Sequence, residues 1–128
     1  LAASADVVIN ALPLTEKTRG LFDRAFFKAI KPGAIFISVG RGQSTVTNEL
    51  VAALESGHLH GAGLDVTDPE PLPADSTVWA MDNVHVTPQI SSWRSGSIRR
   101  ISLSAAENLR RYLAGEALLN PVDMRAGY

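Results

Sequence analysis

The sequence predicts an α/β fold in which a parallel sheet is followed by a long C-terminal helix. Four short apolar runs are near-continuous rather than alternating, which is typical of parallel strands covered on both faces. The runs cover residues 5–12, 34–39, 61–66 and 83–87. Helical patterns separate the first three runs, and such alternation favours a parallel sheet. A periodic apolar stripe beyond the fourth run indicates the long helix.

Each expected helix has recognisable ends. Asp23 is a suitable N-cap for a helix between the first two runs, and Lys31-Pro32-Gly33 ends that helix. Between the second and third runs, Thr47 can cap a helix and Gly57 can end it. The last helix ends at Gly115 and carries apolar residues at helical spacing. These residues are Ile98, Ile101, Ala105, Leu109 and Tyr112 or Leu113.

Composition places further bounds on fold and function. The chain has 128 residues, 45% hydrophobic content, 20% charged content and a formal charge of −1, which predicts one compact domain. This charge balance supplies no field for nucleic acid or an anionic membrane, and no apolar stretch approaches the roughly 18 residues of a membrane span. Without cysteine there are no disulfides or thiolate metal ligands, so we expect a cytoplasmic protein. Because the chain begins with Leu1, we also expect it to be a piece of a longer protein.

Arg41 is the first candidate for chemistry, because it follows the buried run 34–39 and lies between Gly40 and Gly42. A guanidinium group binds a carboxylate through two parallel charge-assisted hydrogen bonds. The flanking glycines let the backbone turn sharply and keep side-chain bulk away from a ligand. Two interpretations stay open at this point, a clamp for a small acid and a surface arginine in a strand-to-helix turn.

Three further polar residues follow the ends of apolar runs. Asp65 ends the third run, Glu70 lies in the rigid proline-rich loop 68–73, and Gln89 follows the fourth run. A preorganised carboxylate can orient a proton donor, although an acidic turn without a partner is the alternative. Since ligands of open α/β sheets bind outside the carboxyl ends of the strands, we expect these side chains and Arg41 to line one crevice.

The histidines and glycine pairs give weaker signals. His58 and His60 lie in a turn after a helix and are expected at the surface, without the spacing of metal ligands. His85 lies in the fourth run, so we expect it on the same strand face as Gln89 and about 13 Å away. Gly61-x-Gly63 lacks the third glycine and the following helix of a phosphate-binding loop. The arginines of the last helix region are expected to form a solvated face.

Several motifs in order resemble those of the D-isomer-specific 2-hydroxyacid dehydrogenases. The motifs are Ala11-Leu12-Pro13-Leu14-Thr15 with Thr18-Arg19-Gly20, then Val39-Gly40-Arg41-Gly42, then Leu64-Asp65-Val66 with Glu70-Pro71-Leu72-Pro73, and finally Asn83-Val84 with Thr87-Pro88-Gln89-Ile90. The resemblance covers the whole chain. The ending Asn120-Pro121-Val122-Asp123, with residues 125–128, is most similar to the glyoxylate and hydroxypyruvate reductase branch.

This resemblance implies a Rossmann-like half-domain. Residues 1–128 would be the second half of a dinucleotide-binding domain plus the returning C-terminal helix, and the protein is expected to form a homodimer. The family reduces a small 2-oxo acid to a 2-hydroxy acid with NADH or NADPH. Arg41 matches the residue that binds the substrate carboxylate, Glu70 the partner of the catalytic histidine, and Asp65 a contact of the nicotinamide. Asn10, Pro13 and Gly40, with Arg41 and Asp65, are thereby implied to lie along the cofactor.

Two departures from the family pattern affect the functional prediction. Gln89 stands where the family's Thr-Pro-His motif supplies the catalytic histidine. A carboxamide cannot act as a general acid, and the loss of such a group typically lowers the rate by about 10²–10⁴. The glycine-rich G-x-G-x-x-G turn is also missing from the sequence. We therefore expect weak or no cofactor binding, an unpaired edge on the first strand and a tendency to pair or aggregate. A non-catalytic NAD(H)-responsive binding module and an interaction domain remain alternatives.

Overall fold

The computed structural model describes residues 2–127, so the terminal residues Leu1 and Tyr128 of the predicted half-domain lie outside the description. The chain divides into two compact units, one up to Ile90 and one from Ser91 onward. The single compact domain expected from composition is therefore wrong, because the residues of the long helix contribute no buried side chain. Each unit is described by itself.

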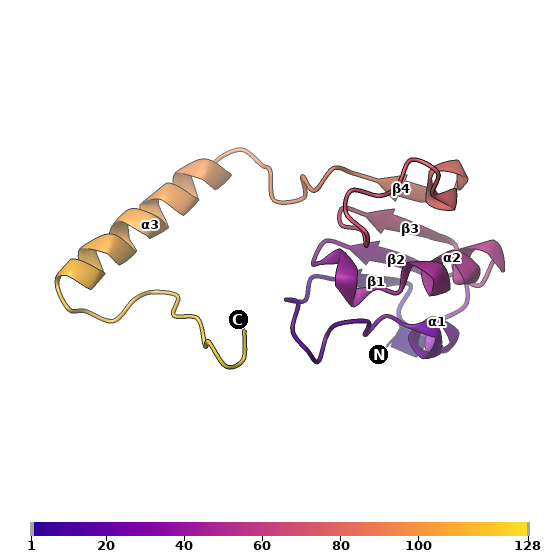
Figure 1. Cartoon of the computed structure of the whole chain (residues 1–128), viewed down its shortest axis with the longest axis horizontal. Coiled ribbons are helices and arrows are strands. Elements are labelled where there is room, and N and C mark those ends of the chain that lie inside the picture. Colours follow the sequence, from indigo (N-terminus) through magenta and orange to yellow (C-terminus); the bar gives the residue numbers. More distant parts are fainter. Residues whose placement is uncertain (1, 128) are drawn as a thin grey trace. The chain divides into compact units, whose positions relative to one another are not determined.

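The first unit is built on a four-stranded sheet in the order β1-β2-β3-β4 (Figure 1). Its strands are β1 (Val7–Asn10), β2 (Ile35–Ser38), β3 (Gly61–Leu64) and β4 (Val84–Val86). All three neighbouring pairs are parallel, which confirms the predicted parallel sheet. The carboxyl ends of the four strands consequently lie at one edge, where the loops that carry the candidate residues begin.

Two α-helices and two short 3₁₀ helices connect the strands, and a third 3₁₀ helix precedes β1. The α-helices of the first unit are α1 (Arg24–Ala29) and α2 (Thr47–Glu55). The 3₁₀ helices are η1 (Ala2–Ser4), η2 (Gly42–Ser44) and η3 (Thr77–Ala80). Asp23 caps α1 as predicted, since its carboxylate accepts a hydrogen bond of 2.9 Å from the Phe26 amide. Loop 68–73 has no helix or strand, also as predicted.

The predicted cap of α2 is wrong. Val46 occupies the N-cap position without a side-chain hydrogen bond, and Thr47 is the first helical residue. The Thr47 hydroxyl instead donates a hydrogen bond of 2.7 Å to the carbonyl oxygen of Asp68. This hydroxyl therefore fastens the start of α2 to the loop after β3.

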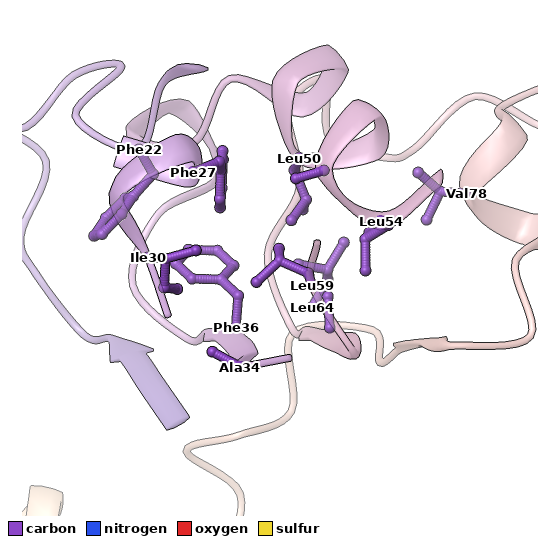
Figure 2. Close-up of a cluster of buried hydrophobic side chains, with 12 residues drawn as sticks. Phe22, Phe27, Ile30, Ala34, Phe36, Leu50, Leu54, Leu59, Leu64 and Val78 are labelled. Atoms are coloured by element: carbon purple, nitrogen blue, oxygen red, sulfur yellow. The ribbon is translucent and has the colours of Figure 1, made fainter. Parts of the chain in front are cut away.

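The core of the first unit lies between the sheet and the two helices. Figure 2 shows side chains of α1 and α2 pointing toward Phe36 of β2, which is completely buried, and toward Leu64 of β3. Phe27 packs edge-on against Phe36 with ring centroids 5.3 Å apart, and Phe22 lies 5.1 Å from the same ring. Burial of these rings stabilises the unit through both apolar area and ring geometry.

The other face of the sheet is not covered within the first unit, so the expectation of strands covered on both faces is wrong there. Val7 and Ile9 on β1 are 45% and 62% exposed, whereas Phe36 on the helical face is 0% exposed. An open hollow of about 480 Å³ lies over Ile35 and Ile37 on this bare face. Among the described residues β1 pairs only with β2, which confirms the predicted unpaired edge.

The second unit contains the predicted long helix α3 (Ser97–Leu113). Gly115, with a φ of +70°, follows its C-cap as expected. On the polar side of α3, Glu107 forms ion pairs with Arg110 at 2.9 Å and Arg111 at 2.8 Å, so these arginines belong to a solvated, charge-paired face. Over residues 2–127 we find no helix with the length and apolar character that crossing a membrane requires.

Candidate functional site

Arg41 follows β2 at the carboxyl edge of the sheet and precedes η2. The residue is exposed and its backbone is extended, with φ −137° and ψ 135°. One guanidinium nitrogen, Nη1, donates a hydrogen bond of 2.9 Å to the carbonyl oxygen of Gly40. Among the described residues this is the only hydrogen bond of the guanidinium, so most of its N–H groups are available to a carboxylate.

Glu70 and Arg41 line the same cleft, which has a volume of about 430 Å³. The cleft lies between the loop after β2 and the proline-rich loop after β3, whose Thr67 and Pro69 also line it. No ion pair joins Arg41 to Glu70 within residues 2–127. The lining of the cleft therefore carries one cationic side chain, Arg41, and two acidic ones, Asp68 and Glu70.

Gly42 brings the two walls of this cleft together. A Cβ atom at this position would lie 1.8 Å from the carbonyl oxygen and 2.1 Å from the carbonyl carbon of Thr67. Both atoms belong to the backbone, so no side-chain rotation can relieve the overlap. Glycine is thus required where the loop of Arg41 meets the loop that leads to Glu70.

Asp65 is buried, with 6% exposure, and organises the loop after β4. Its Oδ1 atom accepts hydrogen bonds from the Thr87 hydroxyl and, at 2.8 Å, from the Ile90 amide. The Thr87 amide also donates to the carbonyl oxygen of Leu64, at 2.9 Å. The carboxylate therefore fastens the segment on either side of Gln89 to the end of β3.

Gln89 is exposed in a tight turn and has a φ of +54°, the one positive φ of a non-glycine residue in the part described. Strand β4 ends at Val86, so Gln89 does not continue the strand. The prediction that His85 and Gln89 share a strand face is therefore wrong, because the Asp65 hydrogen bonds and Pro88 turn the chain away. Gln89 is also not among the residues that line the Arg41–Glu70 cleft.

The expected single crevice is thus only partly assembled. Arg41 and Glu70 meet at the cleft, while Asp65 and Gln89 belong to a neighbouring cluster at the same edge of the sheet. The order of parallel strands explains this division, since β2 and β3 supply the cleft and β3 and β4 supply the cluster.

A buried hydrogen-bond network beneath Arg41 was not predicted. Asn10, Ser38 and Ser44 are 1%, 1% and 0% exposed. The Asn10 Nδ2 donates to Ser38 Oγ at 3.0 Å and to Ser44 Oγ at 2.8 Å, and Ser44 Oγ donates to the Arg41 carbonyl oxygen at 2.7 Å. For Ser38 the available signal was a polar residue at the end of an otherwise apolar strand, whereas Ser44 lies in η2 and had no such signal.

Gly40 and Pro13 border this network. A Cβ atom on Gly40 would lie 2.7 Å from the carbonyl oxygen of Leu12 and 3.3 Å from the Asn10 Oδ1. The loop after β1 therefore packs directly on the backbone of Gly40. Pro13 is exposed in that loop, and its carbonyl oxygen accepts a hydrogen bond of 2.7 Å from the Thr18 hydroxyl.

The histidines take structural or solvent-exposed positions. His60 and His85 are exposed. His58 is half-buried, and its Nε2 lies 3.0 Å from the carbonyl oxygen of Ile30 at the end of α1, so the expected free surface position is wrong for this residue. Among residues 2–127 no group of three or more His, Cys, Asp or Glu side chains is arranged to hold a metal ion.

Comparison with known proteins places this geometry in context. Residues 1–91 match the family model of the D-isomer specific 2-hydroxyacid dehydrogenase, NAD binding domain. The chain is 42% identical over 123 residues to glyoxylate/hydroxypyruvate reductase B of Citrobacter koseri, covering 96% of this chain and 38% of that protein. It therefore spans about two-fifths of the length of such relatives.

Solved structures agree with this similarity. A D-isomer specific 2-hydroxyacid dehydrogenase from Xanthobacter autotrophicus, in complex with NADPH and MES, superposes with a TM-score of 0.92 at 46% identity, over 99% of this chain and 52% of that one. An NADPH-dependent glyoxylate/hydroxypyruvate reductase from Sinorhizobium meliloti, in complex with NADP and sulfate, gives 0.90 at 36% identity, over 99% and 41%.

Proposed function

Because the chain belongs to the D-isomer-specific 2-hydroxyacid dehydrogenase family through its NAD-binding domain, we propose that it serves NAD- or NADP-dependent reduction of a small 2-oxo acid to a D-2-hydroxy acid. The observation that carries this proposal is the cleft shared by Arg41 and Glu70 at the carboxyl edge of a parallel sheet. The likeness to glyoxylate/hydroxypyruvate reductases favours glyoxylate and hydroxypyruvate as substrates.

The described residues fit one end of such a cofactor. Gly40 lets the loop after β1 pack against the end of β2, and residues 11–13 of that loop are exposed. We assign this loop, through Pro13 and its neighbours, together with Gly40 and Asp65 to the nicotinamide end. Asn10 belongs to the same group through its backbone, since its side chain is buried. When bound, NADH or NADPH supplies the hydride.

Arg41 is assigned the substrate carboxylate. Its guanidinium has N–H groups available for two parallel charge-assisted hydrogen bonds, and it faces the cleft also lined by Glu70. Gln89 lies in the neighbouring cluster rather than in the cleft, and it is assigned to the substrate carbonyl oxygen on that side, toward which its carboxamide can donate a hydrogen bond. Because a carboxamide holds no proton that titrates near neutral pH, the alkoxide formed by hydride transfer takes its proton from a water molecule, and solvent neutralises the hydroxide that is left.

A second candidate function is a non-catalytic module that responds to NAD(H). Gln89 favours it, since the residue keeps a hydrogen-bonding group at the position where the family motif carries its acid. In this case Arg41 and the loop after β1 bind ligands without turnover.

A chimera distinguishes the two functions. Residues of this chain replace the matching 123-residue segment of the Citrobacter koseri reductase, and NADPH oxidation is followed with glyoxylate or hydroxypyruvate. Turnover that is lost in Arg41→Ala supports the reductase, and Gln89→His is expected to raise kcat by about 10²–10⁴. A folded chimera that binds NADPH but shows no turnover, even with Gln89→His, contradicts the reductase proposal. Binding with turnover only in Gln89→His supports the binding module.

We also propose that the protein forms a homodimer and lies in the cytoplasm. The open edge of β1 and the exposed apolar residues Val7 and Ile9 support association, and the absence of cysteine supports a reducing compartment. Light scattering after size exclusion is expected to give twice the chain mass, and Ile9→Lys is expected to shift it toward the monomer. A monomer at every concentration contradicts dimer formation, and a secreted fluorescent fusion contradicts the location.

A further inference from the structure

In the hydrogen-bond network of Asn10, Ser38 and Ser44 beneath Arg41, the donor and the acceptor of each bond are defined. The Asn10 carboxamide is oriented by the Leu12 amide, which donates a hydrogen bond of 3.2 Å to Oδ1. The Nδ2 group therefore faces Ser38 and Ser44, and its two hydrogens are both used, at 3.0 and 2.8 Å. No donor of this side chain remains for a ligand.

Because Asn10 is the donor to Ser44, the Ser44 hydroxyl is left to donate elsewhere. Its Oγ accepts a hydrogen from Asn10, so its single hydroxyl hydrogen is free to point at the carbonyl oxygen of Arg41, 2.7 Å away. The Ser44 amide donates to the same carbonyl oxygen at 3.1 Å. Ser44 is 0% exposed, so water does not compete for these bonds.

The Arg41 backbone is consequently held from both sides. The Ser44 hydroxyl donates to the carbonyl oxygen of Arg41, and the Arg41 guanidinium donates to the preceding carbonyl oxygen, that of Gly40, at 2.9 Å. The direction in which the side chain leaves the backbone is set by these two peptide units. The same Asn10 side chain also holds the Leu12 amide, in the loop assigned to the cofactor.

We propose that Asn10 is a positioning residue, which acts through Ser44 to aim Arg41 and couples the place of the arginine to that of the loop after β1. The substrate-binding part of this inference rests on the proposed function. Asn10 does not contact the substrate, and its carboxamide does not contact the cofactor. From the buried end of β1, it fixes the loop after β1 and the loop after β2 in position relative to each other.

Two matched substitutions test the proposal on the 128-residue chain. Ser44→Ala and Ser38→Ala each remove one buried acceptor of Asn10, but only Ser44 continues to Arg41. The decrease in Tm is expected to be larger for Ser44→Ala, which loses two side-chain hydrogen bonds, than for Ser38→Ala, which loses one. The backbone amide and side-chain Nε–H NMR signals of Arg41 are expected to shift and broaden in Ser44→Ala and to stay in place in Ser38→Ala.

Glyoxylate serves as the probe of the second readout. Its NMR-detected affinity at Arg41 is expected to fall about tenfold in Ser44→Ala and less than twofold in Ser38→Ala, since one hydrogen bond is about a tenfold effect. Arg41 signals that are unchanged in Ser44→Ala, or equally changed in both variants, overturn the positioning role. Glyoxylate that fails to perturb Arg41 in the unmodified chain counts against the proposed function, while the Arg41 signals still decide the positioning role.

A further variant covers the case in which Ser44→Ala does not fold. Asn10→Asp keeps the shape of the side chain, but a carboxylate accepts the Ser44 hydroxyl hydrogen and so withdraws it from the Arg41 carbonyl oxygen. Displaced Arg41 signals in Asn10→Asp support the proposal. Arg41 signals that coincide with those of the unmodified chain overturn it.

Discussion

Substituting Gly42 by alanine is expected to separate the two walls of the Arg41–Glu70 cleft. The added Cβ would lie 1.8 Å from the Thr67 carbonyl oxygen and 2.8 Å from the Asp68 amide nitrogen. Ordinary contacts of a Cβ atom begin near 3.4 Å, so the backbone of one loop has to move by more than 1 Å. Because both neighbours are backbone atoms, rotation of a side chain cannot absorb the overlap.

The expected cost is at the upper end of the range for overpacking, about 3 kcal/mol of unfolding free energy. Gly63→Ala provides the control, since it adds the same methyl group to β3 where the nearest atom, Ile37 Cγ1, is 3.7 Å away. This distance is normal van der Waals contact. The control is therefore expected to stay within about 1 kcal/mol of the unmodified chain, with a small gain from the restricted unfolded state.

Urea unfolding followed by far-UV circular dichroism measures both free energies, and NMR of the Arg41 and Glu70 amides reports the position of the loops. If Gly42→Ala loses less than about 1 kcal/mol, or no more than Gly63→Ala, the loops are not in the close contact described and the reasoning from it fails.

Three other predictions follow from particular contacts. Asp65→Ala is expected to lose about 3 kcal/mol in urea unfolding, because two donors lose a charged acceptor, whereas Asp65→Asn retains an acceptor and is expected to lose less; equal losses contradict this account. Gln89→Val is expected to be about 1–2 kcal/mol less stable than Gln89→Gly, since residue 89 has a φ of +54°, and equal stability would refute the left-handed turn. Hydrogen bonds from Arg110 and then Arg111 lower the pKa of Glu107 to about 2 from its ordinary 4.5. Because the folded pKa is the lower one, the contribution of Glu107 to α3 is present above pH 4.5 and is lost as the pH falls toward 2. Ellipticity at 222 nm is expected to show this loss, and Glu107→Gln to lack that part of it; identical pH profiles contradict the prediction.

The sequence by itself determined the elements and their parallel arrangement. Apolar runs, helix periodicity and the Asp23 cap are local features, and their physical causes act within a few residues of the chain. Polar loop residues follow directly after the ends of the strands, which also indicated that Arg41 and Glu70 would lie at one edge of the sheet. The positions of helices and strands follow from nearest neighbours in the chain, and the parallel arrangement follows from the alternation of strands and helices along it.

Only the tertiary structure decided how the polar groups are used. Thr47, predicted as a cap, bonds to a loop 21 residues away, and Asp65 holds an amide 25 residues away. Asn10 reaches Ser44 across 34 residues because the register of β1 on β2 brings their carboxyl ends together. A buried donor takes whichever acceptor the packed backbone places within about 3 Å, and no periodicity in the chain specifies that partner.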